Sequence, residues 1–139
     1  MLHYQLINEK KAIQYLHDSN YDQLWFENLQ QRDDKATVFY RPVHTFGIYE
    51  KGKLFGLIII ENWKVLYEPH IFANKEIRGR RLLRLIQTFL RHNLKSYKIL
   101  IGRVKKDRKD VMKLAKWLKF KHFKEDDKYY YVGVDYESF

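Results

Sequence analysis

The chain has no cysteine at any of its 139 positions. This absence excludes a thiol nucleophile, a disulfide and a metal site built on cysteine. Serine is scarce, and none of Ser19, Ser96 and Ser138 lies in the G-x-S-x-G context of a nucleophile elbow. The histidines are scattered without metal-ligand spacing, so we expect no metal site; they are at positions 3, 17, 44, 70, 92 and 122.

Long hydrophobic runs are missing as well. The longest apolar run, residues 57–60, is far shorter than the ~18 residues that can span a bilayer. The first four residues lack the basic start and the apolar stretch of a signal peptide, so we expect none. These observations predict a cytoplasmic or other intracellular protein that has no membrane partner.

Glycine and proline are also few, with 6 and 2 copies, and no tract rich in Gly, Pro or Ser interrupts the chain. A linker between domains is therefore not expected. The hydrophobic share of 45% and the aromatic share of 17% belong to a globular protein. We predict a single domain over residues 1–139.

Positive charge is what the chain has in excess, and it is unevenly distributed. Residues 1–70 carry 8 Lys or Arg against 9 Asp or Glu, whereas residues 71–139 carry 19 against 8. A basic half usually faces an anionic partner such as nucleic acid, an acidic protein or a phosphorylated cofactor. The lysines are typical of a solvated surface, whereas the arginines at 78, 80, 81 and 84 suit phosphate geometry.

Patterns of apolar residues predict an α/β protein with a mixed sheet covered by helices. Residues 45–49 and 54–61 are rich in aromatic and β-branched residues and flank a turn with Gly52, which is typical of a hairpin. Residues 78–94 have apolar side chains at i, i+3, i+4 and i+7, which indicates an amphipathic helix. The expected order is β-α-α-β-β-β-α-β-α-β. Its strands are residues 2–7, 45–49, 54–61, 65–72, 97–104 and 128–134, and its helices are residues 10–17, 21–31, 78–94 and 107–118.

Three segments between Phe46 and Phe123 carry a resemblance to a known family. Residues 46–58 (FGIYEKGKLFGLI) are similar to a central hairpin, and Glu68 to Phe72 followed by Arg78-Gly79 is similar to a fourth strand that enters a cofactor loop. Residues 111–121 (VMKLAKWLKFK) are similar to a last helix with its closing motif, with Lys119 where glycine is usual. In this order and spacing the chain resembles the GNAT superfamily of N-acyltransferases, in a divergent form that also suits a small phage-type protein.

The resemblance implies that acetyl-CoA is the cosubstrate and that its diphosphate lies at the start of the long helix, where free N–H groups and the helix dipole favour an anion. Small residues usually line this loop, but one alignment puts Arg81 and Leu83 there, and another puts Gly79 first and Arg81 last. Either arginine charge replaces the lost backbone contacts, or the cofactor site is lost. The cofactor-binding residues that the resemblance implies are Ile71, Phe72, Ala73, Arg78, Gly79, Arg80, Arg81 and Arg108.

Acyl transfer to an amine also needs a base for the amine and an acid for the leaving thiolate. Glu68 and His70 are two residues apart, so they share one face of the strand that borders the acceptor site in the family. Either is a candidate catalytic base, directly or through water, although a surface carboxylate and an ordinary half-buried histidine would give the same pattern. The tyrosine that the family often uses as the acid corresponds to Ala115, and Arg108 stands where asparagine is common.

Three functions remain open at this point. The first is transfer of an acetyl or other acyl group from acyl-CoA to an amine, on a small molecule or a protein. The second is a catalytically degenerate GNAT-fold protein that serves as a structural or binding module, in a host cytoplasm or a virion if it derives from a phage. The third is a nucleic-acid binder that uses residues 78–84 and 105–109, with Tyr or Phe stacking on bases.

Overall fold

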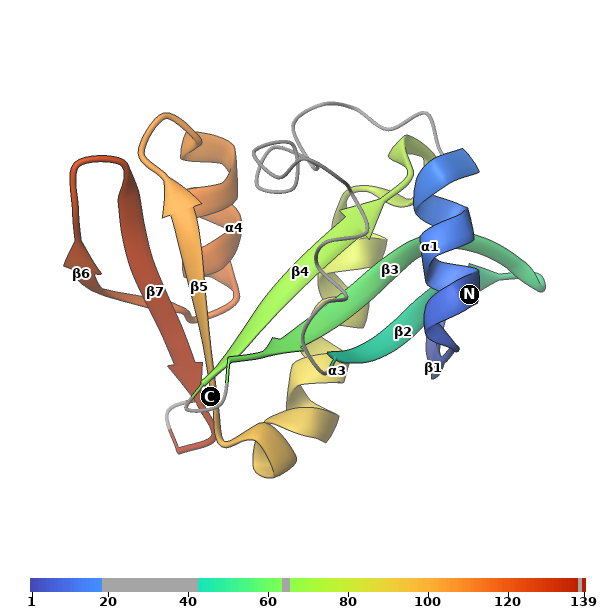
Figure 1. Ribbon diagram of the computed structural model, residues 1–139, viewed down its shortest axis with the longest axis horizontal. Coiled ribbons are helices and arrows are strands. Elements are labelled where there is room, and N and C mark those ends of the chain that lie inside the picture. The colour runs from blue at the N-terminus through green and yellow to red at the C-terminus, as the bar shows by residue number, and fades with distance from the viewer. Residues whose placement is uncertain (19–42, 64–65, 138) are drawn as a thin grey trace.

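The computed structural model describes residues 1–18, 43–63, 66–137 and 139, and the helix expected at residues 21–31 lies outside this part. The described chain forms a seven-stranded mixed sheet in the order β1-β2-β3-β4-β5-β7-β6 (Figure 1). Its strands are β1 (His3–Leu6), β2 (Val43–Glu50), β3 (Lys53–Asn62), β4 (Tyr67–Ala73), β5 (Ile99–Lys105), β6 (Lys121–Glu125) and β7 (Tyr129–Asp135). The predicted α/β class is confirmed.

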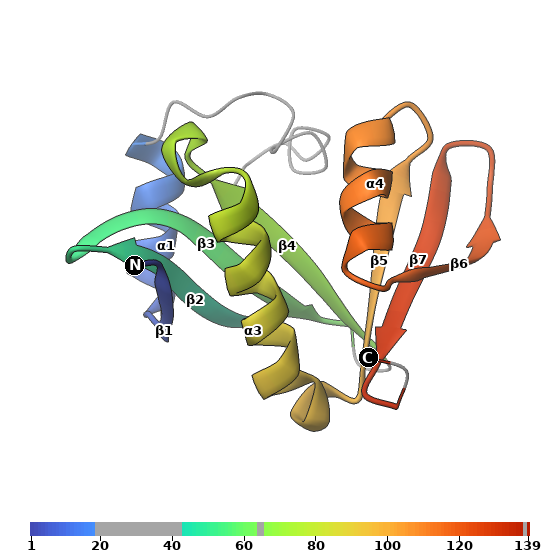
Figure 2. The ribbon, with the colours of Figure 1, turned by 180° about the vertical axis from the view of Figure 1, so that it is seen from behind.

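Helices cover both faces of the sheet (Figures 1 and 2). On one face, α1 (Glu9–Asp18) buries Ala12 and Leu16 against Leu57, Ile59 and Phe72 of β3 and β4. On the other face lie α3 (Arg80–Tyr97) and α4 (Lys109–Trp117). Alternation along β3 explains the two layers, because Leu57 and Ile59 point to α1 whereas Ile58 and Ile60 join the core with α3.

The long helix begins and ends slightly later than its apolar pattern predicts. Gly79 has φ 115°, which is not helical, so α3 begins at Arg80 and the expected first residue, Arg78, precedes it. Arg78 instead ends a short 3-10 turn, η2 (Lys75–Ile77). At the other end Tyr97 belongs to the helix rather than to the next strand, and Lys98, with φ 70°, terminates it.

One strand was not expected from the sequence. β6 pairs with β7 at the edge of the sheet, and all five of its residues are exposed. Its sequence KHFKE lacks apolar alternation because neither face of this strand is covered. The actual order of the described elements is therefore β-α-β-β-β-α-β-α-β-β, with the short turn η2 between β4 and α3.

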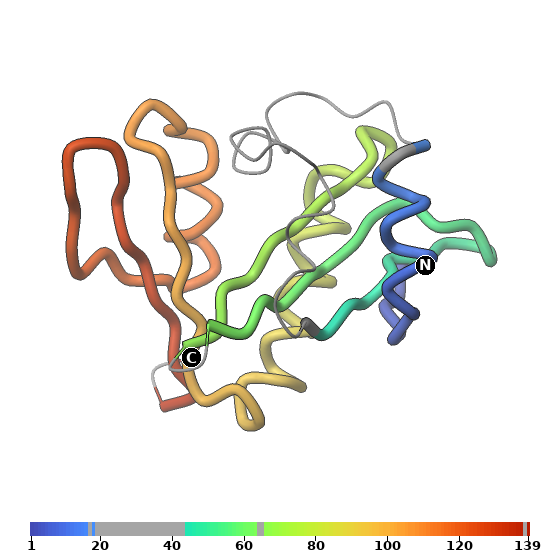
Figure 3. The backbone as a smooth tube through the Cα atoms, in the orientation of Figure 1, coloured from blue at the N-terminus to red at the C-terminus, as the bar shows by residue number. Residues whose placement is uncertain are grey.

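The sheet opens between β4 and β5, its one parallel pair. In the part of the chain that the structure describes, these strands are paired at a single position, Tyr67 with Leu100. Figure 3 shows the two strands starting side by side near the C-terminus and then separating. α3 follows the far end of β4 and α4 follows the far end of β5, so both helices begin at the open end of this gap (Figures 1 and 2). Among the described residues, no helix is long and apolar enough to cross a membrane.

Candidate active site

Glu68 and His70 lie on the α1 face of β4, as their spacing predicts. Glu68 is opposite Glu61 of β3 in the antiparallel ladder, and His70 is opposite Ile59. Both side chains are buried, with 5% and 8% of their surface exposed, and Glu61 is fully buried. The interpretation of Glu68 as a surface carboxylate is therefore wrong.

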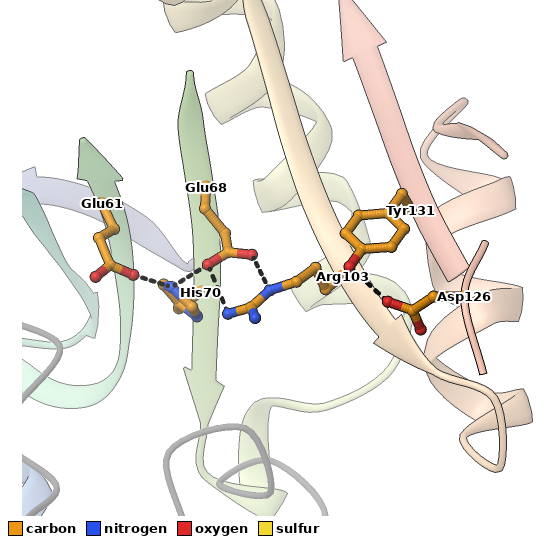
Figure 4. Close-up of polar contacts among 6 residues, drawn as sticks. All are labelled: Glu61, Glu68, His70, Arg103, Asp126 and Tyr131. Atoms are coloured by element: carbon orange, nitrogen blue, oxygen red, sulfur yellow. Dashed lines mark hydrogen bonds and ion pairs between the residues drawn. The ribbon is translucent and has the colours of Figure 1, made fainter. Parts of the chain in front are cut away.

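The three buried side chains form one polar cluster together with Arg103 of β5 (Figure 4). His70 Nε2 lies 3.0 Å from Glu61 Oε1 and 3.5 Å from Glu68 Oε1. Arg103 Nε donates to Glu68 Oε2 at 3.1 Å, and its Nη2 donates to Glu68 Oε1 at 3.5 Å. We call Glu61, Glu68, His70 and Arg103 the buried quartet. Because Arg103 comes from β5, the quartet bridges the gap between β4 and β5.

The charges of the quartet control one another. Burial would raise the pKa of Glu68, but its bonds and charge interactions with His70 and Arg103 outweigh burial and lower that pKa from 4.5 to about 2. Burial would lower the pKa of His70, but its hydrogen bonds to Glu61 and Glu68 outweigh burial and raise that pKa above 6.5. At neutral pH the resting site therefore holds an ionised Glu68, and the neighbouring carboxylates favour the protonated form of His70.

Arg103 is the accessible member of the quartet. Its side chain is 36% exposed, and its guanidinium carbon lies 5.9 Å from the ring centroid of Trp63 and 5.5 Å from that of Tyr129. Ring faces attract a guanidinium, so these aromatic side chains help to hold it in place. Arg103 thus connects the buried carboxylates to solvent.

Glu61, Glu68 and His70 are also the candidate metal ligands of the described chain. Their ligand atoms lie within 4.8 Å of one another. In the arrangement observed, however, His70 Nε2 and the guanidinium of Arg103 already contact these carboxylates. A divalent cation bound there would have to displace these contacts.

The candidate cofactor loop joins β4 to α3. Gly79 is the N-cap of α3 and has no side chain that could bond the free N–H groups of the first turn. Arg78 turns back, and its Nε and Nη2 donate to the Ala73 carbonyl at 3.1 and 3.0 Å. Arg81 turns away from the gap to pair with Glu50 of β2, and Arg80 is exposed.

Arg108 lies on the other side of the gap, immediately before α4. It is buried, and its Nε and Nη2 each donate to a carboxylate oxygen of Asp110 at 3.0 Å. The candidate cofactor residues thus lie in three places, namely the end of β4 (residues 71–73), the loop and first turn of α3 (residues 78–81) and the residue before α4 (Arg108). All three places lie toward the open end of the gap, whereas Glu68 and His70 lie earlier in β4 (Tyr67–Ala73).

The closing strand β7 places a tyrosine opposite Arg103. Tyr131 is paired with Arg103 in the sheet, and its hydroxyl donates to Asp126 Oδ2 at 2.8 Å (Figure 4). That hydrogen bond raises the pKa of Tyr131, so the phenol stays protonated but its proton is already engaged. Ala115, where the family often has tyrosine, is buried against Val104 and Val132.

Sequence reasoning missed Glu61 and Arg103. Glu61 follows the apolar run 57–60 directly, and Arg103 lies between apolar residues of a predicted strand. A charged residue inside a strand that is otherwise apolar is a signal for a buried polar partner. Alternation would have placed Glu61 and Glu68 on one face only if the register of β3 with β4 had been known.

Known proteins match this chain in structure but not in sequence. No protein-family model and no curated protein matches this sequence. Solved structures do match. The N-acetyltransferase PseH of Campylobacter jejuni, in complex with acetyl coenzyme A, is 17% identical with a TM-score of 0.65, and the match covers 98% of this chain and 99% of that one.

Two further acetyltransferases match over nearly their whole length. A mutant of the spermidine N-acetyltransferase SpeG of Vibrio cholerae is 13% identical with a TM-score of 0.69, and 96% of this chain and 93% of that one are covered. The IAA acetyltransferase of Bacillus cereus is 13% identical with a TM-score of 0.64, and the coverage is 97% and 99%. At these identities the likeness concerns the fold. The chain has the fold of the GNAT acetyltransferases.

Proposed function

We propose that the protein transfers an acyl group, most simply acetyl, from acyl-CoA to an amine. The observation that carries this proposal is the gap between β4 and β5. It opens beyond the Tyr67–Leu100 pair, holds Glu68 and His70 at its side, and ends at the starts of two helices. Strands that separate leave main-chain groups without a ladder partner, and an extended pantetheine arm could pair with them.

Coenzyme A would lie with its diphosphate at the start of α3. The exposed Gly79 and Arg80 offer N–H groups and a guanidinium, and the helix dipole favours an anion there. Ile71, Phe72 and Ala73 would supply the main chain beside the arm, and Arg108 would face it from α4. In this proposal Arg78 and Arg81 act mainly by shaping the loop, because their guanidinium groups bind Ala73 and Glu50.

The charge states of the quartet assign different roles to Glu68 and His70. The amine nitrogen attacks the thioester carbonyl carbon, the carbon–sulfur bond breaks, and the amine gives up a proton while the thiolate takes one. Glu68 is ionised at rest and can accept the amine's proton, directly or through water, whereas the raised pKa of His70 favours the role of proton donor for the thiolate. Because the pKa of Glu68 is about 2, Glu68 is a weak base, and the acceptor must arrive largely as the neutral amine.

The acceptor is proposed to be a primary amine carried by a small molecule or a protein. Among the structural neighbours, SpeG is a spermidine N-acetyltransferase, which makes a polyamine a reasonable first substrate to test. The buried carboxylates Glu61 and Glu68 both lie on the α1 face of the sheet. An amine that reacts at Glu68 would have to approach from that face.

A structural or binding module without catalysis is the second candidate. It is favoured by one observation, namely that Arg78 and Arg81 are engaged within the protein rather than directed into the gap. The same fold would then persist with a cofactor loop that no longer binds phosphate.

Calorimetric titration with acetyl-CoA separates the two candidates, because a ligand that binds only the folded state also raises its stability. We expect binding with a matching rise in melting temperature. Titration with ADP would measure the part of the affinity that comes from the α3 loop. Titration with pantetheine would measure the part that comes from the gap between β4 and β5. Absence of heat and of any thermal shift at millimolar acetyl-CoA would contradict the enzyme and favour the module. Release of free thiol from acetyl-CoA with spermidine would then test transfer itself.

A further inference from the structure

The outer surfaces of α3 and α4 carry positive charge in rows. On α3, Arg84, Arg91 and Lys95 recur at intervals of seven and four residues, so they share one face of the helix. That face is opposite the buried one, which includes Leu82, Phe89 and other apolar residues that pack on the sheet. The row is about 17 Å long, because each helical residue adds ~1.5 Å.

A second row lies on α4, where Lys109, Lys113 and Lys116 are exposed and recur at intervals of four and three residues, so they also share one face. Both helices cover the same face of the sheet (Figure 2), so the two rows point to the same side of the molecule. We call Arg84, Arg91, Lys95, Lys109, Lys113 and Lys116 the basic helix face.

Little negative charge opposes this surface. α3 contains no Asp or Glu among its 18 residues, and the one acid of α4, Asp110, pairs with Arg108. No ion pair joins any member of the basic helix face to the described residues, namely 1–18, 43–63, 66–137 and 139. An ordinary solvated helix mixes both signs, since i, i+4 pairs of opposite charge stabilise it. Here the net charge is kept positive along two helices.

We infer that the basic helix face binds the phosphate backbone of a nucleic-acid duplex without reading its sequence. A duplex is a rigid rod with one negative charge per ~1.7 Å of axis, which matches straight rows of cations on two rigid helices. Lysine and arginine contacts to phosphate supply affinity and position but carry no base information. This inference goes beyond acyl transfer and does not depend on it.

Other anionic partners fit the surface less well. A helix that lies on a membrane inserts an apolar face beside its basic one, but the apolar face of α3 is consumed in the core. Single strands are held by aromatic platforms on which the bases stack. The basic helix face has no aromatic member, although Trp117, 48% exposed, lies beside Lys113 and Lys116 on α4.

Fluorescence anisotropy with a labelled duplex of about 20 base pairs tests the inference. We expect a dissociation constant near 10⁻⁵ M at physiological salt that is independent of sequence, the range of non-specific binding. If most of the six cations contact phosphates, the log–log dependence on salt should have a slope of about −4 to −5. A duplex that does not bind even at low salt would overturn the inference.

A charge-matched pair of variants shows whether this surface, rather than overall charge, is responsible. Arg91→Glu with Lys95→Glu removes two members of the face, whereas Lys10→Glu with Lys11→Glu makes the same change in net charge on α1, across the sheet. We expect at least about tenfold weaker binding for the first double variant and a change within about threefold for the second. Equal losses would overturn the inference.

Three further measurements complete the test. Acetyl-CoA binding by the Arg91/Lys95 variant should be unchanged, because both residues are remote from the start of α3, and this result separates the inference from the proposed enzyme. If that variant unfolds, Arg91→Gln with Lys95→Gln takes its place. Stronger binding to vesicles of anionic lipid than to duplex would overturn the inference. Preference for a single strand that is lost in Trp117→Ala would overturn it as well.

Discussion

Arg103 of β5 holds Glu68 of β4 through Nε at 3.1 Å, although the two strands are paired only at Tyr67 and Leu100 in the described chain. The ion pair spans the place where the strands separate. One guanidinium therefore connects the two halves of the sheet and, together with His70, keeps the candidate catalytic carboxylate ionised.

Arg103→Ala should raise the pKa of Glu68 toward its ordinary value, because the Arg103 charge and hydrogen bond both lower it. The substitution leaves the buried carboxylate with one partner fewer, so the free energy of unfolding should fall by about 1–3 kcal/mol. Carboxyl titration by NMR and urea unfolding measure the two effects. Arg103→Lys should retain part of the lowered Glu68 pKa and part of the free energy of unfolding. Arg91→Ala should change neither quantity. An unaltered Glu68 titration would show that His70 alone holds the carboxylate ionised.

Glu68→Gln should lower kcat for acetyl transfer by about 10²–10⁴, the usual contribution of a general base, with acetyl-CoA binding nearly unchanged. His70→Gln should lower kcat as well, because the thiolate would lose a proton donor. Steady-state rates with spermidine and titration of acetyl-CoA measure the two quantities separately. Full activity in both variants would show that the acceptor amine does not react at the quartet.

Arg80→Ala should weaken acetyl-CoA binding by about 1–3 kcal/mol, as expected when a charged hydrogen bond is lost. Arg80 is chosen because its side chain is exposed at the start of α3, whereas Arg78 also ties the loop to Ala73. Arg91→Ala on the same helix is the control for general charge. Calorimetry that gives the same loss for both arginines would argue against a phosphate site at the start of α3.

Gly79→Ala should destabilise the fold by about 1–2 kcal/mol, because φ 115° is costly for any residue with a Cβ. Apart from its chain neighbours, no atom of the described residues lies within 4 Å of the added methyl group, so the cost would come from the backbone alone. Gly102 is the matched control. A Cβ there likewise meets no atom of the described residues within 4 Å beyond its chain neighbours, and its φ lies outside the left-handed range. Thermal unfolding should leave Gly102→Ala near the parent, and equal losses would refute this explanation.

The contribution of the quartet to the free energy of unfolding should be greatest between about pH 4.5 and pH 6.5. The contribution of Glu68 is complete above its ordinary pKa of 4.5 and is lost as the pH falls toward about 2. The contribution of His70 is complete below its ordinary pKa of 6.5 and is lost as the pH rises through its raised value. Urea unfolding from about pH 5 to pH 9 should show the decline, and His70→Gln should flatten it. A decline that persists in His70→Gln would assign it to other groups.

Local patterns were sufficient to predict most of the described elements. The apolar spacing of residues 78–94 and the hairpin around Gly52 are both found, because a helix and a two-strand turn are determined by neighbours in sequence. The edge strand β6 was missed for the opposite reason. Its exposed residues have no apolar face, and its partner β7 alone defines it.

The candidate site was predicted only in part. The spacing of Glu68 and His70 placed them on one face, since a strand alternates every residue. Glu61 and Arg103 join them through the pairing of β3 with β4 and through a side chain that crosses the gap. Such contacts depend on register and on where two strands diverge, which neighbouring residues along the chain do not encode.

In the described chain the one residue pair between β4 and β5, Tyr67 with Leu100, is where the sheet can most easily come apart. Everything from Ile99 to Asp135 is continuous in the chain and pairs within itself, as β5 with β7 and β7 with β6. This segment can act as a separate cooperative unit, whose amides exchange with deuterium at a lower free energy than those of β2, β3 and β4. A cosubstrate arm lying between β4 and β5 would take the place of a missing strand, and the two units would then exchange as one.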